Sequence, residues 1–143
     1  MISAGQLISE RVMLKNDRFF AVSARDGSIK PGDFYGDGLW LGDTRLLSAF
    51  RLLIDGIEPD PVGVQADDGS ATFELEAAAV HVTRVRYLDG GLHERITVAN
   101  RGSVTVDAVL EIEVAADFAA MLGIRGAVPE LASPVPVPPV KTV

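Results

Sequence analysis

The chain has 143 residues, which fits one domain with its own hydrophobic core, because single domains cluster at roughly 100 to 150 residues. Its 20 Asp and Glu outnumber 13 Lys and Arg and give a net charge of -7. This balance argues against a nucleic-acid partner, since phosphate binding depends on clustered basic residues. The chain contains no cysteine, which excludes disulfides, thiolate metal ligands and a catalytic thiol.

Residues 1–16 carry charges among scattered apolar residues. They lack the unbroken apolar segment of roughly 7 to 15 residues that a signal peptide needs. Elsewhere no stretch approaches the ~18 consecutive apolar residues of a membrane-spanning helix. The sequence therefore predicts a cytoplasmic protein without a membrane partner.

The first predicted elements form a hairpin from about Val12 to Val22, with a turn at Asn16-Asp17. A loop rich in Gly and Asp follows over residues 25–38. It leads to a segment from Thr44 to Ile54 that is apolar on both strand faces, which is typical of a strand covered on both sides. The same segment also fits helical spacing, but the Asp55-Gly56 turn favours the strand.

The second half has the clearest strand pattern. Glu58 to Asp68 predicts an edge or irregular strand, because its prolines cannot donate to a ladder. Residues 71–76 and 80–88 are the next predicted strands. The second of them changes the parity of its apolar residues midway, which predicts a bulge near Thr83 or Arg84.

Two further strands continue this pattern. Residues 92–98 place Leu92, Ile96 and Val98 inward, and residues 104–114 alternate strictly between apolar and polar side chains. Short turns join these two strands to each other and to the strand before them, which predicts an antiparallel meander. The fold class that follows is all-β, an antiparallel β-sandwich.

The end of the chain differs in composition. Residues 115–123 lose the alternation and predict a short helix or loop. We expect its large apolar side chains to pack inward: Phe118, Met121 and Leu122. A proline-rich run near the end is extended and typical of a linker. The predicted organisation is a β-sandwich domain over residues 1–127 and a proline-rich tail over residues 128–143.

Motifs for a cofactor are missing from the sequence. It has no P-loop, dinucleotide fingerprint, Gly-x-Ser-x-Gly or His-Glu-x-x-His, so we expect no cofactor. Its two histidines, His81 and His93, fall on neighbouring predicted strands, but a metal site needs a third ligand. We interpret both as outward-facing strand residues and expect no metal.

One acidic residue, Glu94, falls on the inward parity of the strand over residues 92–98. A buried carboxylate needs a partner, which Arg45, Arg84 or Arg95 can supply. Glycoside hydrolysis needs two carboxylates placed across a sugar, and many pairs among the acidic residues satisfy such a spacing by chance. We therefore favour a structural ion pair over a catalytic role.

A second candidate site lies at the polar corner Asp43-Thr44-Arg45. Its side chains either hold sugar hydroxyls or a neighbouring domain, or they fix the corner. In the structural interpretation Asp43 accepts backbone N–H bonds, and Arg45 pairs with Asp43 or Glu94. Trp40, together with Tyr35, is either a platform for sugar stacking or a lid on the core. The candidate contacts for a substrate or a domain interface are Trp40, Asp43, Arg45, Glu94 and Arg95.

Several segments, taken in order, resemble a known family. They are Gly38-Leu39-Trp40, Asp43-Thr44-Arg45-Leu46-Leu47-Ser48, Leu53-Ile54-Asp55-Gly56, Arg86-Tyr87-Leu88, the run from Gly91 to Asn100, Ala116-Asp117-Phe118-Ala119 and Ile124-Arg125-Gly126. From about Phe20 to Gly126 the chain resembles the N-terminal domain of bacterial glycogen-debranching-type proteins (amylo-α-1,6-glucosidase-like). The resemblance implies a β-sandwich that is followed, in the longer chain, by an (α/α)6-barrel glycosidase domain carrying the catalytic acids.

The resemblance therefore implies an accessory domain with no catalytic activity of its own. The matched corner Asp43-Thr44-Arg45 would then contact the barrel or its substrate mouth. The partners that follow are a glycosidase barrel or, through an uncovered apolar patch, a second copy of the chain. The alternative is a stand-alone module that binds α-glucan by stacking on Trp40 and Tyr35. A small hydrolase is a third interpretation, but it lacks any recognisable constellation of residues.

Overall fold

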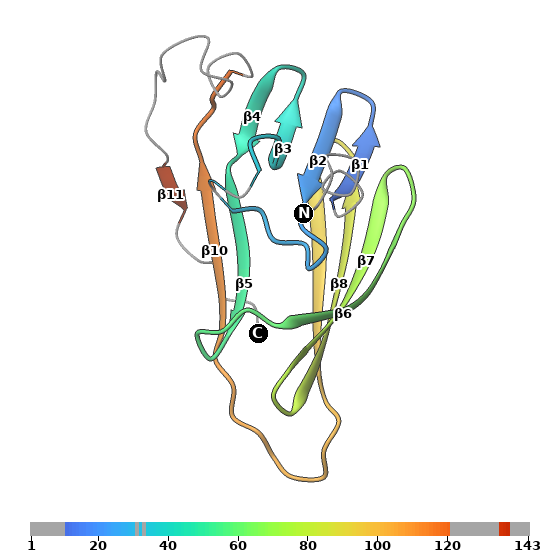
Figure 1. The fold of residues 1–143 in the computed structure, drawn as a ribbon, viewed down its shortest axis with the longest axis vertical. Helices are drawn as coiled ribbons and strands as arrows, with labels where there is room; N and C mark the ends of the chain where they lie inside the picture. The colour runs from blue at the N-terminus through green and yellow to red at the C-terminus, as the bar shows by residue number, and fades with distance from the viewer. Residues whose placement is uncertain (1–10, 31, 33, 121–134, 138–143) are drawn as a thin grey trace, which may run out of the picture.

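A computed structural model describes residues 11–30, 32, 34–120 and 135–137. The regular elements within these ranges are all β-strands, which confirms the predicted all-β class (Figure 1). They are β1 (Val12–Asn16), β2 (Phe19–Ser23), β3 (Gly38–Leu41), β4 (Thr44–Leu47), β5 (Ala49–Ile54), β6 (Asp60–Ala66), β7 (Ser70–Ala77), β8 (Val80–Leu88), β9 (Leu92–Asn100), β10 (Leu110–Ala116) and β11 (Val135–Val137). No helix in the described ranges is long and apolar enough to cross a membrane.

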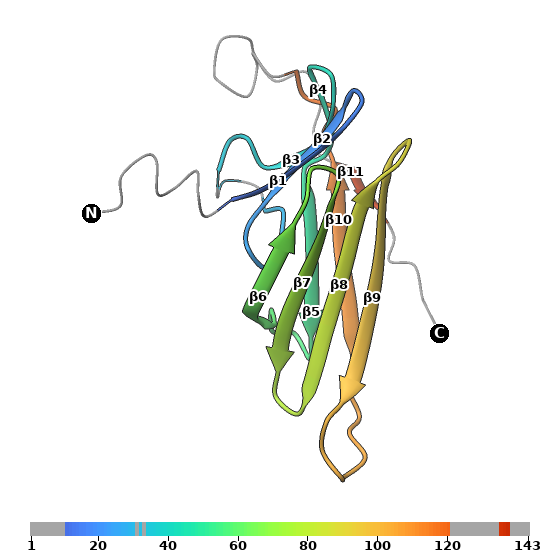
Figure 2. The same ribbon diagram turned by 90° about the vertical axis from the view of Figure 1, so that its right-hand side faces the viewer.

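The strands form three antiparallel sheets with the orders β1-β2-β3-β4, β6-β7-β8-β9 and β11-β10-β5. Figure 1 shows β5 and β10 on one side of the molecule and β7 and β8 on the other. In Figure 2 the sheet of β6 to β9 lies in front and covers β5 and β10. The small sheet of β1 to β4 lies across the upper end of these two layers. This arrangement is the antiparallel β-sandwich that the alternation predicts.

The core lies between the two layers. Leu52 and Ile54 of β5 face Phe73 and Leu75 of β7 and Val82 of β8, and each of these residues is at most 5% exposed. Burying an aliphatic or aromatic side chain contributes roughly 1.5–3 kcal/mol. Apolar contact between inward-facing positions is therefore what holds the layers together.

The N-terminal hairpin and the extended segment after Trp40 are confirmed. β1 and β2 pair across a two-residue turn, and β4 and β5 occupy the segment for which a helix was the rival interpretation. The segment changes sheet at Ser48, whose N–H donates to Ala115 O at 2.8 Å. β6 is an edge strand with an irregular register between Pro61 and Gly63, as its prolines predict.

The bulge predicted in the strand over residues 80–88 is wrong. β8 pairs continuously with β7 and with β9. Its inward parity runs from Val80 to Leu88 and includes Arg84 and Arg86, each 1% exposed. The prediction failed because it required an apolar residue at every inward position, whereas two arginines occupy the centre of this face.

The strand predicted over residues 104–114 begins only at Leu110. Residues 101–109 form a long loop between the two layers (Figures 1 and 2), and Val104 within it is 73% exposed. β10 pairs with β5 and β11, so it is not a member of the predicted meander. The meander is instead formed by β6 to β9.

The segment predicted as a short helix or loop contains no helix among its described residues. Ala115 and Ala116 complete β10, and residues 117–120 continue beside β4, with Arg45 N–H donating to Ala119 O at 2.9 Å. Phe118 is 60% exposed, so the inward packing predicted for it is wrong. Met121 and Leu122 lie outside the described residues, as does most of the proline-rich tail. The predicted boundary at residue 127 stays a prediction.

Candidate functional site

The first candidate cluster joins Arg84 and Arg86 of β8 to Glu94 of β9. Arg84 Nη2 donates to Glu94 Oε2 at 2.8 Å, and Arg86 Nε donates to Glu94 Oε1 at 2.7 Å. The side chains are 1%, 1% and 5% exposed. The predicted pairing of Glu94 with Arg84 is confirmed. Sequence analysis missed Arg86, although its position two residues after Arg84 places both on one strand face.

The two guanidinium groups also hold a loop and the opposite layer. Arg84 Nη1 donates to Asp26 O at 3.1 Å, and Arg86 Nη2 donates to Gly27 O at 2.7 Å. Both guanidinium carbons lie 5.1 Å from the centroid of the Phe50 ring on β5. Gly27 has a φ of +86°, and a Cβ there would lie 3.2 Å from Arg84 Nη1. The cluster therefore fixes the turn at residues 24–28 against the sandwich.

Burial sets the electrostatics of this cluster. Desolvation lowers the pKa of Arg86, while the neighbouring Glu94 carboxylate opposes that effect. Two guanidinium groups share the one carboxylate of Glu94, and Asp26 supplies a further negative charge nearby. A buried ion pair is costly to desolvate and is strongly destabilising when one partner is removed. Glu94 is thus engaged in charge compensation within the fold.

A groove of about 920 Å³ lies beside this cluster, between β9 and β10. Its described lining residues are Phe50, Tyr87, Leu92, His93, Glu94, Arg95, Ile96, Val98, Leu110 and Ile112. Most of these are apolar, and Glu94 is the one carboxylate among them. Glycoside hydrolysis by the usual route needs two carboxylates, so these lining residues do not provide a hydrolytic site.

The second candidate cluster is the corner around Arg45. Arg45 Nε lies 3.1 and 3.2 Å from the two carboxylate oxygens of Asp117, and Arg45 Nη2 also donates to Asp117 Oδ2. Arg45 Nη1 donates to Asp37 O at 3.3 Å. The structure therefore pairs Arg45 with Asp117 rather than with Asp43 or Glu94. The reason is that the chain after β10 continues along β4 and brings Asp117 to this corner.

Trp40 packs into the same corner and is 1% exposed. Its ring stacks on Phe20 with the centroids 5.7 Å apart, and its indole N–H donates to Gly36 O at 3.0 Å. The Arg45 guanidinium lies 5.7 Å from the ring centroid. These contacts give Trp40 the position of a core lid, and its buried ring offers no face to a sugar. Tyr35, in contrast, is 56% exposed.

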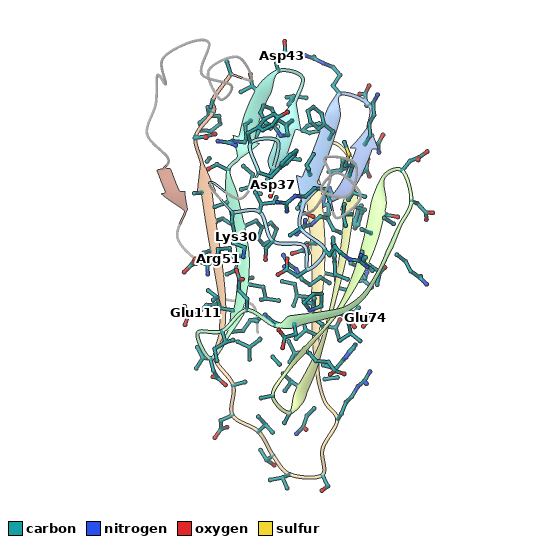
Figure 3. The ribbon with its side chains drawn as sticks, viewed as in Figure 1. Lys30, Asp37, Asp43, Arg51, Glu74 and Glu111 are labelled. Carbon is teal, nitrogen blue, oxygen red and sulfur yellow. The ribbon has the colours of Figure 1, made fainter. Side chains whose placement is uncertain are left out.

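The structure brings together two of the five candidate contacts, Trp40 and Arg45. Glu94 lies in the other cluster, whereas Asp43 is exposed in the turn between β3 and β4 (Figure 3) and Arg95 is exposed on β9. Sequence analysis missed Asp117, which is 3% exposed.

The two histidines occupy separate surroundings. His81 Nε2 contacts the Glu74 carboxylate, and the His93 ring stacks on Tyr87 with the centroids 4.8 Å apart. The described residues contain no group of three or more His, Cys, Asp or Glu that could hold a metal ion. Each histidine thus has a side-chain partner within the sheet of β6 to β9.

These features define an antiparallel β-sandwich domain whose buried charges are engaged with one another and with the backbone. The sequence profile of the family described as the N-terminal domain of (some) glycogen debranching enzymes matches residues 14–135. The chain belongs to this family, since the match covers most of its length. No curated protein matches the chain. The family match confirms the resemblance found in the sequence.

A charged network lies on the outer face of β5 and β10. Arg51 Nε contacts Glu58 Oε1 at 2.9 Å and Arg51 Nη1 contacts Glu113 Oε2 at 2.8 Å, while Lys30 Nζ lies 2.9 Å from Glu58 Oε2. Figure 3 shows Lys30 and Arg51 near each other on this side of the sandwich. Partial burial raises the pKa of Glu58, but hydrogen bonds from Arg51 and Lys30 outweigh it and hold the pKa below the ordinary 4.5.

Glu58→Gln is expected to lower the free energy of unfolding by about 0.5 kcal/mol at pH 7, because solvent screens these partly exposed pairs. The folded-state pKa of Glu58 is depressed, so its contribution is present above pH 4.5 and is lost as the pH falls through the folded pKa. Urea unfolding measured from pH 7 down to below the folded-state pKa of Glu58 should therefore show the free energies of unfolding of wild type and variant converging in acid. Glu111→Gln, an exposed change on β10, is the control. A difference that widens in acid would contradict this account.

Proposed function

We propose that the chain is a non-catalytic accessory domain that packs against an (α/α)6 glycosidase domain and helps to shape its substrate entrance. The observation that carries this proposal is the family match over residues 14–135. The proposal includes a role in α-glucan metabolism in the cytoplasm. The glycosidase domain would supply the catalytic acids, and this domain would supply a rigid surface.

The buried carboxylates support the non-catalytic role. A glycosidase acid or base must reach the glycosidic bond or a water beside it. Both oxygens of Glu94 accept hydrogen bonds from Arg84 and Arg86, and both oxygens of Asp117 accept them from Arg45. These hydrogen bonds engage the carboxylate oxygens that a catalytic acid or base would need for proton transfer.

Two side chains at the groove between β9 and β10 provide apolar surface for association. Val98 is 41% exposed and Leu110 is 40% exposed, and both line the groove. Exposed apolar patches are common sites of protein association. In the absence of the glycosidase domain, a second copy of the chain would be the partner for this surface.

The test of the proposed function is titration of the purified chain with maltooligosaccharides, followed by isothermal calorimetry and by the fluorescence of Trp40. We expect no saturable binding at millimolar sugar and no release of glucose from an α-1,6-branched glucan. Saturable binding would favour the stand-alone α-glucan module. Hydrolysis that survives further purification would contradict the non-catalytic role.

A further inference from the structure

The strand β11 sets the direction of the chain that follows it. β11 pairs with β10 antiparallel, with Val135 opposite Ala116 and Val137 opposite Val114, and it lies beside the upper part of β10 (Figure 1). Because the register is antiparallel, each extended residue after Val137 falls opposite an earlier residue of β10. The chain that leaves β11 is therefore directed along β10 toward Leu110, where β10 begins.

This first part of β10 has a free edge. β11 pairs with β10 over Val114–Ala116, so residues 110–113 have no neighbouring strand on that side in the described chain. Across from them β9 ends its sheet, and no described strand lies on its side away from β8. The groove of about 920 Å³ opens between these two strands. The direction of β11 thus leads the chain to this groove.

We propose that the segment after β11, residues 138–143, docks into the groove between β9 and β10. The segment reads Pro-Pro-Val-Lys-Thr-Val. At about 3.1 Å per residue for an extended proline-rich chain, it spans roughly 19 Å. Along β10, Val114 and Leu110 are separated by roughly 13 Å, at ~3.3 Å per residue. The segment is therefore long enough to pass Leu110.

The composition of the segment fits the groove. Proline-rich segments bind grooves lined by aromatic and apolar side chains, and their stiff extended backbone loses little entropy on binding. The lining includes Tyr87, Val98 and Leu110, which are 42%, 41% and 40% exposed. Pro138 and Pro139 have no N–H, so packing them against these side chains buries no unsatisfied donor.

The prolines also decide how the segment binds. Pro136 lies within β11 opposite Ala115, and a proline fits a paired strand where its missing N–H would point away from the partner. This direction alternates along a strand, so the nitrogen of Pro138 would again point away from β10, whereas that of Pro139 would point toward it. Hydrogen-bonded pairing therefore stops at Pro139, and apolar packing holds the rest of the segment.

Attachment to β11 favours this segment over other occupants of the groove. A tethered ligand acts at an effective concentration of about millimolar, which gives it an advantage over a second copy in dilute solution. In a longer enzyme the docked segment would also start the following glycosidase domain on the side of β9 and β10. That consequence rests on the proposed function, whereas the docking is a property of the isolated chain.

The test is paramagnetic relaxation enhancement in the isolated chain. The chain has no cysteine, so Lys141→Cys accepts a single nitroxide label. We expect strong broadening of the amide signals of Val98, Leu110 and Ile112. We expect none in the turn between β1 and β2, at the opposite end of the molecule (Figure 1). Val98→Asp should abolish the broadening, because a charge in the groove opposes apolar packing. Val62→Asp, an exposed change on the edge strand β6, should leave it intact.

Three results would overturn the inference. Absent broadening at Leu110, or equal broadening at both ends of the molecule, would mean that the segment does not dock. Broadening that persists in Val98→Asp would place the segment beside β10 but outside the groove. Broadening of an isotope-labelled chain by a separate nitroxide-labelled chain would assign the groove to a second copy. Each of these results leaves the proposed function standing, because sugar titration and the joined domains test that function separately.

Discussion

Replacing Glu94 with alanine is expected to lower the free energy of unfolding by about 3–5 kcal/mol, because it leaves two guanidinium groups buried without their carboxylate. Arg84 and Arg86 are each 1% exposed and share Glu94, so neither can turn to water without opening the sandwich. Guanidinium unfolding monitored by circular dichroism and by Trp40 fluorescence measures this loss. It is a large fraction of the 5–15 kcal/mol typical of a domain.

Two variants show whether charge compensation is the cause. Glu113→Ala removes a carboxylate that is 52% exposed, and its effect should stay within about 0.5 kcal/mol. Replacing the cluster together, with Arg84→Met, Arg86→Met and Glu94→Leu, should recover much of the stability, since apolar residues of similar volume often substitute for a buried ionic cluster. A loss below about 1 kcal/mol for Glu94→Ala would contradict the account, because the buried charges would then have another partner.

Asp117→Asn is expected to lower the free energy of unfolding by about 3 kcal/mol, at the low end of the range for a broken buried pair. The lower value is expected because the Arg45 side chain is 14% exposed against 4% for Asp117. The amide keeps the size of the carboxylate but cannot balance the guanidinium charge. Urea unfolding gives the magnitude, and hydrogen exchange should show faster exchange at the amide of Arg45, which bonds to Ala119.

Asp43→Asn is the matched control for this prediction. It makes the same chemical change in the same corner, but Asp43 is exposed in the turn between β3 and β4. Its effect should stay within about 0.5 kcal/mol. Equal losses for the two variants would mean that the negative charge of the corner as a whole matters, rather than the pair of Asp117 with Arg45.

Local alternation predicts most of the strands correctly, because burial on one face imposes a period of two on the sequence. The same reasoning fails at β8, where Arg84 and Arg86 occupy inward positions. If every inward position is assumed to be apolar, the sequence of β8 fits a strand only with a bulge. The strand and its register depend on Glu94 and on the loop carbonyls, which compensate the two charges.

Alternation is also insufficient to predict a strand where the segment has no neighbouring strand to pair with. Residues 104–109 alternate as regularly as β10 does, but the described chain places no strand beside them. A strand requires a ladder of hydrogen bonds to a neighbour, and that neighbour is a property of the topology. The loop instead crosses between the layers, where its apolar residues remain exposed.

The candidate site shows the same limit. The sequence suggests Asp43 or Glu94 as the partner of Arg45, whereas the structure pairs it with Asp117, 72 residues away. Only the path of the chain after β10 brings the two together. The backbone of Phe118 is also not predictable from the sequence. Its φ is +50°, in the left-handed region, but nothing in Ala116-Asp117-Phe118-Ala119 requires a positive φ.

Hydrogen–deuterium exchange compared between the isolated chain and the same domain joined to a glycosidase domain tests the proposed packing most directly. Docking onto a glycosidase domain through the groove between β9 and β10 should slow amide exchange in these two strands near Val98 and Leu110, and it should leave the turn between β7 and β8 unchanged. Identical exchange in the two proteins at every described amide would contradict the packing and, with it, the function proposed for this domain.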